Sequence, residues 1–116
     1  MRIGVRLVVA AALLALCGCS VWPVDQDPKG MDYRRSANRV MEALQAYRRD
    51  HGAFPSSLSA LTPSYIPALP DEPQLTYHAY DGSLSYRYIP SWPQLRPVWC
   101  ASVGDTTDWR CQEHLI

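Results

Sequence analysis

The four cysteines are the side chains of this chain that can take part in the most kinds of reaction. Cys17 and Cys19 close an apolar run in the first twenty residues, whereas Cys100 and Cys111 lie eleven residues apart much later in the sequence. A cysteine thiol can carry a lipid, form a disulfide, bind a metal or act as a nucleophile, and its surroundings decide which. The two pairs therefore need separate interpretations.

The first pair ends a segment that has the features of a bacterial export signal. Arg2 and Arg6 form a basic region, and the apolar run 7–16 is too short to span a bilayer but suits the hydrophobic part of a signal peptide. The sequence at 16–20, LCGCS, then resembles a lipobox, the site at which a lipoprotein signal peptide is removed. In that pattern a leucine stands three residues before the modified cysteine, and a small residue stands directly before it.

The lipobox resemblance implies cleavage between Gly18 and Cys19 and a diacylglyceryl group on the Cys19 thiol. Cys17 does not fit, because it would place the bulky Leu16 next to the cleavage site. Several acyl chains, at ~0.8 kcal/mol for each buried CH₂ group, hold a protein on a membrane far longer than one chain does. Ser20 after the cysteine implies sorting to an outer membrane, with the protein facing the periplasm. The alternative is an ordinary secretory signal with two incidental cysteines.

The rest of the sequence has the size of one small domain. We expect a signal peptide at 1–18, a lipidated N-terminus with a flexible tether at 19–30, and a folded domain at 31–116. Loss of the signal removes two of the eleven basic residues and leaves nine against eleven acidic ones, a net charge of −2. This balance argues against nucleic acid as a partner. A core this small is expected to need a covalent staple.

Cys100 and Cys111 are expected to form that staple as a disulfide. They are the thiols that remain after cleavage and lipidation, and export brings them into a compartment that permits oxidation. The simplest hairpin register between segments 98–103 and 109–113 also places them opposite each other. A metal site that combines them with His114 is the alternative, but C-x-x-C and H-x-x-x-H spacings are absent. We expect no metal and no cofactor.

The elements that position these residues follow from the apolar pattern. No proline occurs between Pro28 and Pro55, and apolar residues recur at three- and four-residue steps across 32–51, which predicts an amphipathic helix. Asp32 is the expected N-cap, and Gly52 the expected stop. The predicted buried face holds Tyr33, Ala37, Val40, Met41, Leu44 and Tyr47, and the exposed face holds Arg35, Asn38, Arg39, Glu42, Gln45, Arg49 and Asp50. A short turn with Leu58 and Leu61 and a proline-rich loop anchored by Tyr65, Ile66 and Leu69 follow.

Segments 75–80 and 84–89 alternate between apolar and polar residues, and Asp81-Gly82 between them predicts a two-residue type I′ hairpin. In that register Tyr77 lies opposite Tyr86 on the apolar face, with Leu75 opposite Tyr88 and Ala79 opposite Leu84. Together with segments 98–103 and 109–113, the pattern predicts an α+β fold. One long helix packs on a small antiparallel sheet of about four strands.

Residues 43–55 (ALQAYRRDHGAFP) resemble the end of the long helix in type IV pilins and type II secretion pseudopilins. In those families a tyrosine, a charged pair, a turn glycine and an aromatic-proline step follow one another. The resemblance covers 40–89, roughly half of the chain, and implies a pilin-like head domain associated with a secretion or pilus apparatus. The family's cleavage site, glutamate and membrane-spanning helix are replaced here by the lipobox. Polymerisation is therefore not implied, and we expect a monomeric domain.

The sequence contains no motif of a known catalytic constellation. His51, His78 and His114 are expected to be exposed, and Asp105 with Asp108, similar to the acidic calcium loop of pseudopilins, supply too few oxygens for that ion. Trp92, Trp99 and Trp109 are expected in the core, with an exposed binding platform as the alternative. Tyr80, Arg87 and Trp92 form the candidate interaction surface.

The sequence thus favours a non-catalytic envelope lipoprotein, anchored to the membrane through its lipid, that presents a surface to a protein partner. Two alternatives remain. One is a surface lipoprotein that binds glycans or peptides, and the other is a small periplasmic enzyme with a pocket around His78 or His114.

Overall fold

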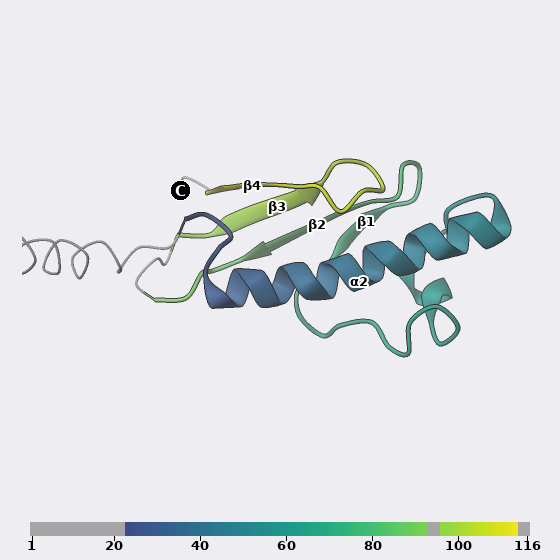
Figure 1. Ribbon diagram of the computed structural model, residues 1–116, viewed down its shortest axis with the longest axis horizontal. Helices are drawn as coiled ribbons and strands as arrows, with labels where there is room; N and C mark the ends of the chain where they lie inside the picture. Colours follow the sequence, from purple (N-terminus) through teal and green to yellow (C-terminus); the bar gives the residue numbers. More distant parts are fainter. Residues whose placement is uncertain (1–22, 93–95, 114–116) are drawn as a thin grey trace, which may run out of the picture.

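The computed structural model describes residues 23–92 and 96–113, so the predicted signal peptide, Cys19 and His114 lie outside the described residues. It contains helix α2 (Pro28–His51), the 3-10 helix η1 (Leu58–Leu61) and strands β1 (Thr76–His78), β2 (Ser83–Tyr88), β3 (Val98–Ser102) and β4 (Trp109–Glu113). The strands form an antiparallel sheet in the order β1-β2-β3-β4, and α2 lies along one of its faces (Figure 1). This arrangement confirms the α+β class and the packing of a long helix on a four-stranded sheet.

The start of α2 differs from the prediction. Its N-cap is Asp27, whose carboxylate accepts a hydrogen bond from the Gly30 N–H at 3.2 Å. Pro28 occupies the first turn, where a missing N–H costs no helical hydrogen bond. Asp32, the expected cap, lies inside the helix and pairs with Arg35. Residues 28–30, which the sequence assigned to a tether, are therefore part of the folded domain.

The β1–β2 hairpin has a register two residues away from the predicted one. Tyr77 pairs with Leu84 rather than with Tyr86, so the other two expected pairs are wrong as well. A shift of two residues leaves each side chain on its original face of the sheet, because side chains alternate with a period of two. Leu84 and Tyr86 are buried as predicted, whereas Tyr77 is half-buried.

The turn itself explains this register. A type I′ turn needs a positive φ at both central residues, and Asp81 does not have one. Its carboxylate instead accepts a hydrogen bond from the Ser83 N–H at 2.9 Å, and residues 79–82 form a wider loop. Gly82, with φ of 72°, lies against the Phe54 ring so closely that a Cβ there would overlap it. The longer loop thus places a residue without a side chain against the ring of a distant residue.

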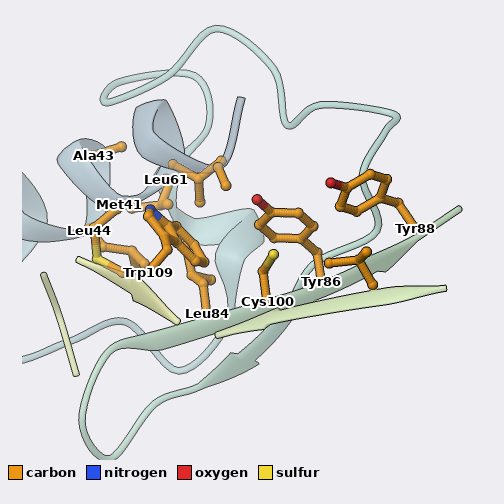
Figure 2. Packing of buried hydrophobic residues seen from close by; sticks show 12 residues of the cluster. Met41, Ala43, Leu44, Leu61, Leu84, Tyr86, Tyr88, Cys100 and Trp109 are labelled. Carbon is orange, nitrogen blue, oxygen red and sulfur yellow. The ribbon is translucent and has the colours of Figure 1, made fainter. Parts of the chain in front are cut away.

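The core fills the space between α2 and the sheet (Figure 2). Tyr86 lies at its centre, 2% exposed, with its ring edge-to-face against Trp109 at 5.4 Å between centroids. Tyr65 and Ile66 from the proline-rich loop pack against this core, as expected. The buried cluster consists of Ala37, Val40, Met41, Ala43, Leu44, Leu61, Leu84, Tyr86, Tyr88, Val98, Cys100 and Trp109.

Two polar helix residues expected to face solvent contact the β3–β4 hairpin instead. The indole N–H of Trp109 donates to Asn38 Oδ1 at 2.7 Å, and Gln45 Nε2 donates to the Asp105 carbonyl at 2.7 Å. Within the hairpin, Cys100 lies opposite Cys111 in the predicted register, and the two form a disulfide.

Candidate functional site

The structure separates the three residues expected to form an interaction surface. Tyr80 is 83% exposed in the loop that precedes β2, and Trp92 is 80% exposed beyond the other end of that strand. Arg87 lies within β2 and is exposed. The surface is therefore not a single cluster, and Arg87 has different neighbours from those expected.

Those neighbours lie on the sheet face that α2 leaves uncovered. Trp99 on β3 pairs directly with Arg87 on β2, and Gln112 on β4 pairs with Trp99. Residues opposite each other in an antiparallel sheet have Cβ atoms about 5 Å apart, so these side chains form one row across three strands. The adjacent residues Tyr86 and Cys100 point toward α2 (Figure 2), which directs the row outward.

This row of side chains lines a shallow hollow of about 950 Å³. It is lined by Gln74, Thr76, Ser85, Tyr86, Arg87, Tyr88, Ile89, Pro97, Trp99 and Gln112. Arg87 is the cation in that set, which contains no acidic side chain, and no described carboxylate forms a salt bridge with it. A guanidinium can bind a carboxylate through two parallel N–H groups, and the indole of Trp99 offers a flat apolar surface beside it.

Trp99 is the residue of this site that the predicted interaction surface left out, because that surface contained Trp92 and Trp99 was expected in the core. Trp109 is buried there, but Trp99 is 40% exposed and Trp92 more so. The signal was present in the strand pattern. Trp99 alternates with Val98 and Cys100, and a disulfide that closes the hairpin on the buried side would have placed Trp99 on the outer face.

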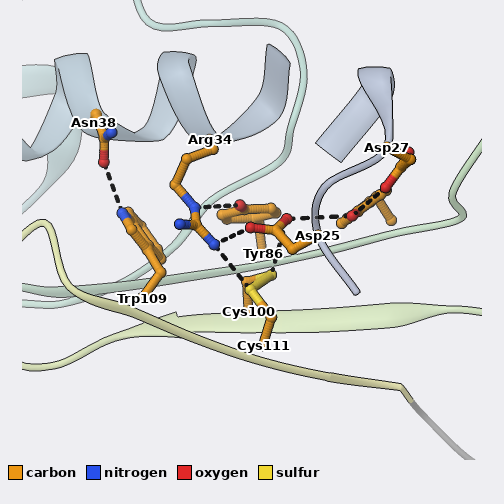
Figure 3. The surroundings of a disulfide bond; sticks show 9 residues. Asp25, Asp27, Arg34, Asn38, Tyr86, Cys100, Trp109 and Cys111 are labelled. Carbon is orange, nitrogen blue, oxygen red and sulfur yellow. Dashed lines mark hydrogen bonds and ion pairs between the residues drawn. A yellow bond between two sulfur atoms is a disulfide. The ribbon is translucent and has the colours of Figure 1, made fainter. Parts of the chain in front are cut away.

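A second group of polar residues lies inside the molecule, where α2 begins (Figure 3). The Asp25 carboxylate forms an ion pair with Arg34. Arg34 also donates from Nε to the Tyr86 hydroxyl at 3.3 Å and from Nη2 to Cys111 Sγ at 3.1 Å. Cys100 Sγ lies 3.5 Å from Asp25 Oδ1. The disulfide and the segment before α2 are thus joined through one partly buried ion pair.

Asp27 forms the other half of this network and is 1% exposed. It accepts hydrogen bonds from the Tyr88 hydroxyl at 2.9 Å and from the Ser91 N–H at 3.1 Å, in addition to the Gly30 N–H. A Cβ at Gly30 would overlap the Tyr88 hydroxyl, so a glycine there lets the helix approach the strand closely. Asp27 therefore connects the helix start, strand β2 and the chain that follows β2.

The environment shifts the pKa values of the two aspartates in opposite directions and raises those of the two tyrosines. Burial raises the pKa of Asp25, and the Arg34 guanidinium only partly offsets that rise. Burial would also raise the pKa of Asp27, but the hydrogen bonds from Ser91, Tyr88 and Gly30 outweigh it and lower the pKa. Burial raises the pKa of Tyr86 to about 12, and burial with the Asp27 hydrogen bond raises the pKa of Tyr88 further. Both phenols stay protonated at neutral pH.

The lowered pKa of Asp27 predicts a loss of stability in acid. A carboxyl whose pKa is lower in the folded than in the unfolded chain binds a proton on unfolding, so its contribution is present above its ordinary pKa of 3.8 and is lost as pH falls below it. The pKa of Asp25 is raised, so its contribution to the free energy of unfolding changes with pH in the opposite direction. We expect the free energy of unfolding to fall less between pH 6 and pH 2.5 in Asp27→Asn than in the wild type, as measured by chemical denaturation. Equal losses would contradict this assignment.

The buried network offers no metal-binding thiolate. The Asp25 carboxylate and the two sulfurs lie within 4.8 Å of one another, but the sulfurs are bonded to each other, and only a thiolate binds metal well. Asp105 of the acidic loop pairs with Arg48 at 3.0 Å, and Asp108 contacts Arg110 at 3.4 Å.

The histidines within the described residues are exposed, as expected. His51 lies beside the Tyr65 hydroxyl, with 3.2 Å between Nε2 and the oxygen, and the same hydroxyl donates to Asp50 at 2.7 Å. His78 lies near the Tyr80 ring. Neither histidine lines the hollow over the outer sheet face.

Within residues 23–92 and 96–113, no helix combines the length and the apolar character needed to cross a bilayer. In comparisons with protein-family models, curated proteins and solved structures, the chain matches none.

Proposed function

We propose that this protein is a non-catalytic envelope lipoprotein that binds a protein partner through the outer face of its sheet. The observation that carries the proposal is the pairing of Arg87 with Trp99 in a hollow whose described lining has no acidic residue. Tryptophan and arginine are the residues most enriched at the energetic centres of protein interfaces. The partner surface that fits presents a carboxylate for Arg87 next to an apolar side chain for Trp99.

The anchoring part of the proposal depends on Cys19 and the lipobox around it. Lipid on Cys19 would hold the domain at the periplasmic face of the outer membrane, with a partner in the same envelope. The domain is proposed to have a pilin-like head, because residues 43–55 resemble the helix end of pilins and pseudopilins. It is proposed to be monomeric, because the lipobox replaces the membrane-spanning helix of those families. This resemblance directs the search for the partner to secretion and pilus machineries.

A photoreactive amino acid placed at Gln112 in the full-length protein tests the binding face. Gln112 is exposed on β4 and completes the row with Trp99 and Arg87. Illumination of intact cells is expected to give one discrete protein adduct, because the partner lies over the hollow. The matched control carries the same group at Arg49, an exposed position on α2, and is expected to give no such adduct.

Substitutions at Arg87 and Trp99 identify the side chains that bind the partner. Arg87→Glu and Trp99→Ala, each checked for an unchanged melting temperature, are expected to abolish the Gln112 adduct, whereas Arg87→Lys keeps the charge and retains part of it. An adduct that persists in both disruptive variants would rule out this face as the binding site. Co-sedimentation with cell-wall glycan that depends on Trp99 would favour the glycan-binding alternative instead.

A further inference from the structure

Among the described residues, most of the exposed large apolar side chains lie at the end of the molecule where α2 begins. Val24, Met31, Ile89 and Trp92 are each more than 40% exposed. Tyr80 and Val103 are exposed at the opposite end of the sheet, in the loops that precede β2 and follow β3. Soluble monomeric proteins expose such residues singly, so a group of four at one end needs an explanation.

The Asp27 network holds these four residues at the same end. Each is a close sequence neighbour of a residue in that network. Val24 precedes Asp25, Met31 follows Gly30, Ile89 follows Tyr88, and Trp92 follows Ser91. The network residues are joined by hydrogen bonds of 2.9 to 3.2 Å to the two aspartates. The apolar end is therefore built by fixed contacts between the helix start and the chain after β2.

The same end lies next to the expected anchor. The described chain starts at Pro23, and the four residue steps from Cys19 reach at most ~14 Å when fully extended. Helix α2 has 24 residues and is therefore ~36 Å long, and it runs away from Pro23 toward the other end of the sheet (Figure 1). A lipid on Cys19 would thus keep the helix start close to the bilayer surface.

We infer that this apolar end contacts the membrane directly, with Trp92 inserted at the lipid interface and Val24 and Met31 beside it. The inference rests on the proposed lipid anchor at Cys19. Tryptophan favours the boundary between headgroups and acyl chains. The nearby charges are nearly balanced, because Asp32 pairs with Arg35 and Glu113 contacts Arg96 at 3.8 Å. The contact is therefore apolar, and it leaves most of the outer sheet face free for a partner.

Quenching of tryptophan by brominated phospholipid tests this orientation. The full-length lipoprotein, carrying Trp22→Phe to remove the tryptophan nearest the anchor, is reconstituted in vesicles whose acyl chains are brominated near the headgroup. We expect a loss of emission relative to unbrominated vesicles, and we expect Trp92→Phe to remove that loss. Trp99→Phe is the matched control, because Trp99 is also exposed but lies on the sheet face, and it should leave the loss unchanged. Zwitterionic and anionic vesicles are expected to quench equally.

The outcomes separate the orientation from the anchor. Mass spectrometry and flotation of the same sample report the lipid on Cys19. Protein without that lipid would overturn the proposed anchoring and the orientation with it. Lipidated, floating protein whose Trp92 is not quenched would overturn the orientation alone. Quenching that depends on Trp99 instead would mean that the sheet lies flat on the bilayer, which also contradicts the inference.

Discussion

Replacement of Tyr86 by alanine is expected to lower the free energy of unfolding by about 3 to 5 kcal/mol. The ring is 2% exposed and packs edge-to-face on Trp109 and on Tyr33, with 5.4 and 6.5 Å between centroids. Truncation would leave a cavity in the centre of the core and would also remove the hydroxyl that accepts from Arg34. Chemical denaturation of the chain without residues 1–19 measures the loss.

The adjacent residue provides the control. Arg87→Ala changes a side chain of comparable size on the opposite face of the same strand and is expected to change stability by no more than ~0.5 kcal/mol. Tyr86→Phe keeps the ring and isolates the hydroxyl, for which a loss of about 1 kcal/mol is expected. Similar losses at positions 86 and 87 would contradict the assignment of faces in β2.

Reduction of the Cys100–Cys111 disulfide is expected to lower the melting temperature by on the order of 10 °C or more. The bond joins residues eleven apart, and release of such a loop costs about 2 to 4 kcal/mol through the greater freedom of the unfolded chain. The two sulfurs also contact Arg34 and Asp25. Reduction therefore also removes a fixed contact of the Asp25–Arg34 ion pair. Calorimetric melts with and without reductant give the difference.

A double variant, Cys100→Ala with Cys111→Ala, separates the bond from side effects of the reductant. It should melt near the temperature of the reduced wild type and should not respond to reductant. A wild-type melting curve that reductant leaves unchanged would show that the bond does not contribute to stability.

The elements of this fold could be predicted from sequence because each has a strong local signal. The apolar spacing from Tyr33 to Tyr47 predicted the helix, and Gly52, with φ of 77°, ends it as expected. Alternation predicted the burial of Leu84, Tyr86 and Tyr88 and the exposure of Arg87, whereas Ser85, expected on the exposed face, is buried. The hairpin register that places Cys100 opposite Cys111 also followed from alternation and loop length alone.

The features that could not be predicted depend on contacts between distant segments. The first hairpin has a wider loop in which Gly82 packs against Phe54, 28 residues earlier in the sequence, and local sequence carries no sign of that contact. Asp27 was assigned to a tether because its partners, Tyr88 and Ser91, are more than 60 residues away. The candidate binding face was only partly foreseen for the same reason. Arg87 was recognised on its strand, but Trp99 became its neighbour only through strand pairing.

The position of Trp109 on the last strand has a consequence for biogenesis. This residue completes the core against Tyr86 and bonds to Asn38 on the helix, 71 positions earlier, and two residues beyond it Cys111 closes the disulfide. The helix is synthesised first, yet its apolar face has no complete partner until β4 emerges. Domains fold as cooperative units, so the native structure forms only once β4 has joined the sheet. Until then the apolar face of the helix remains accessible to chaperones and proteases.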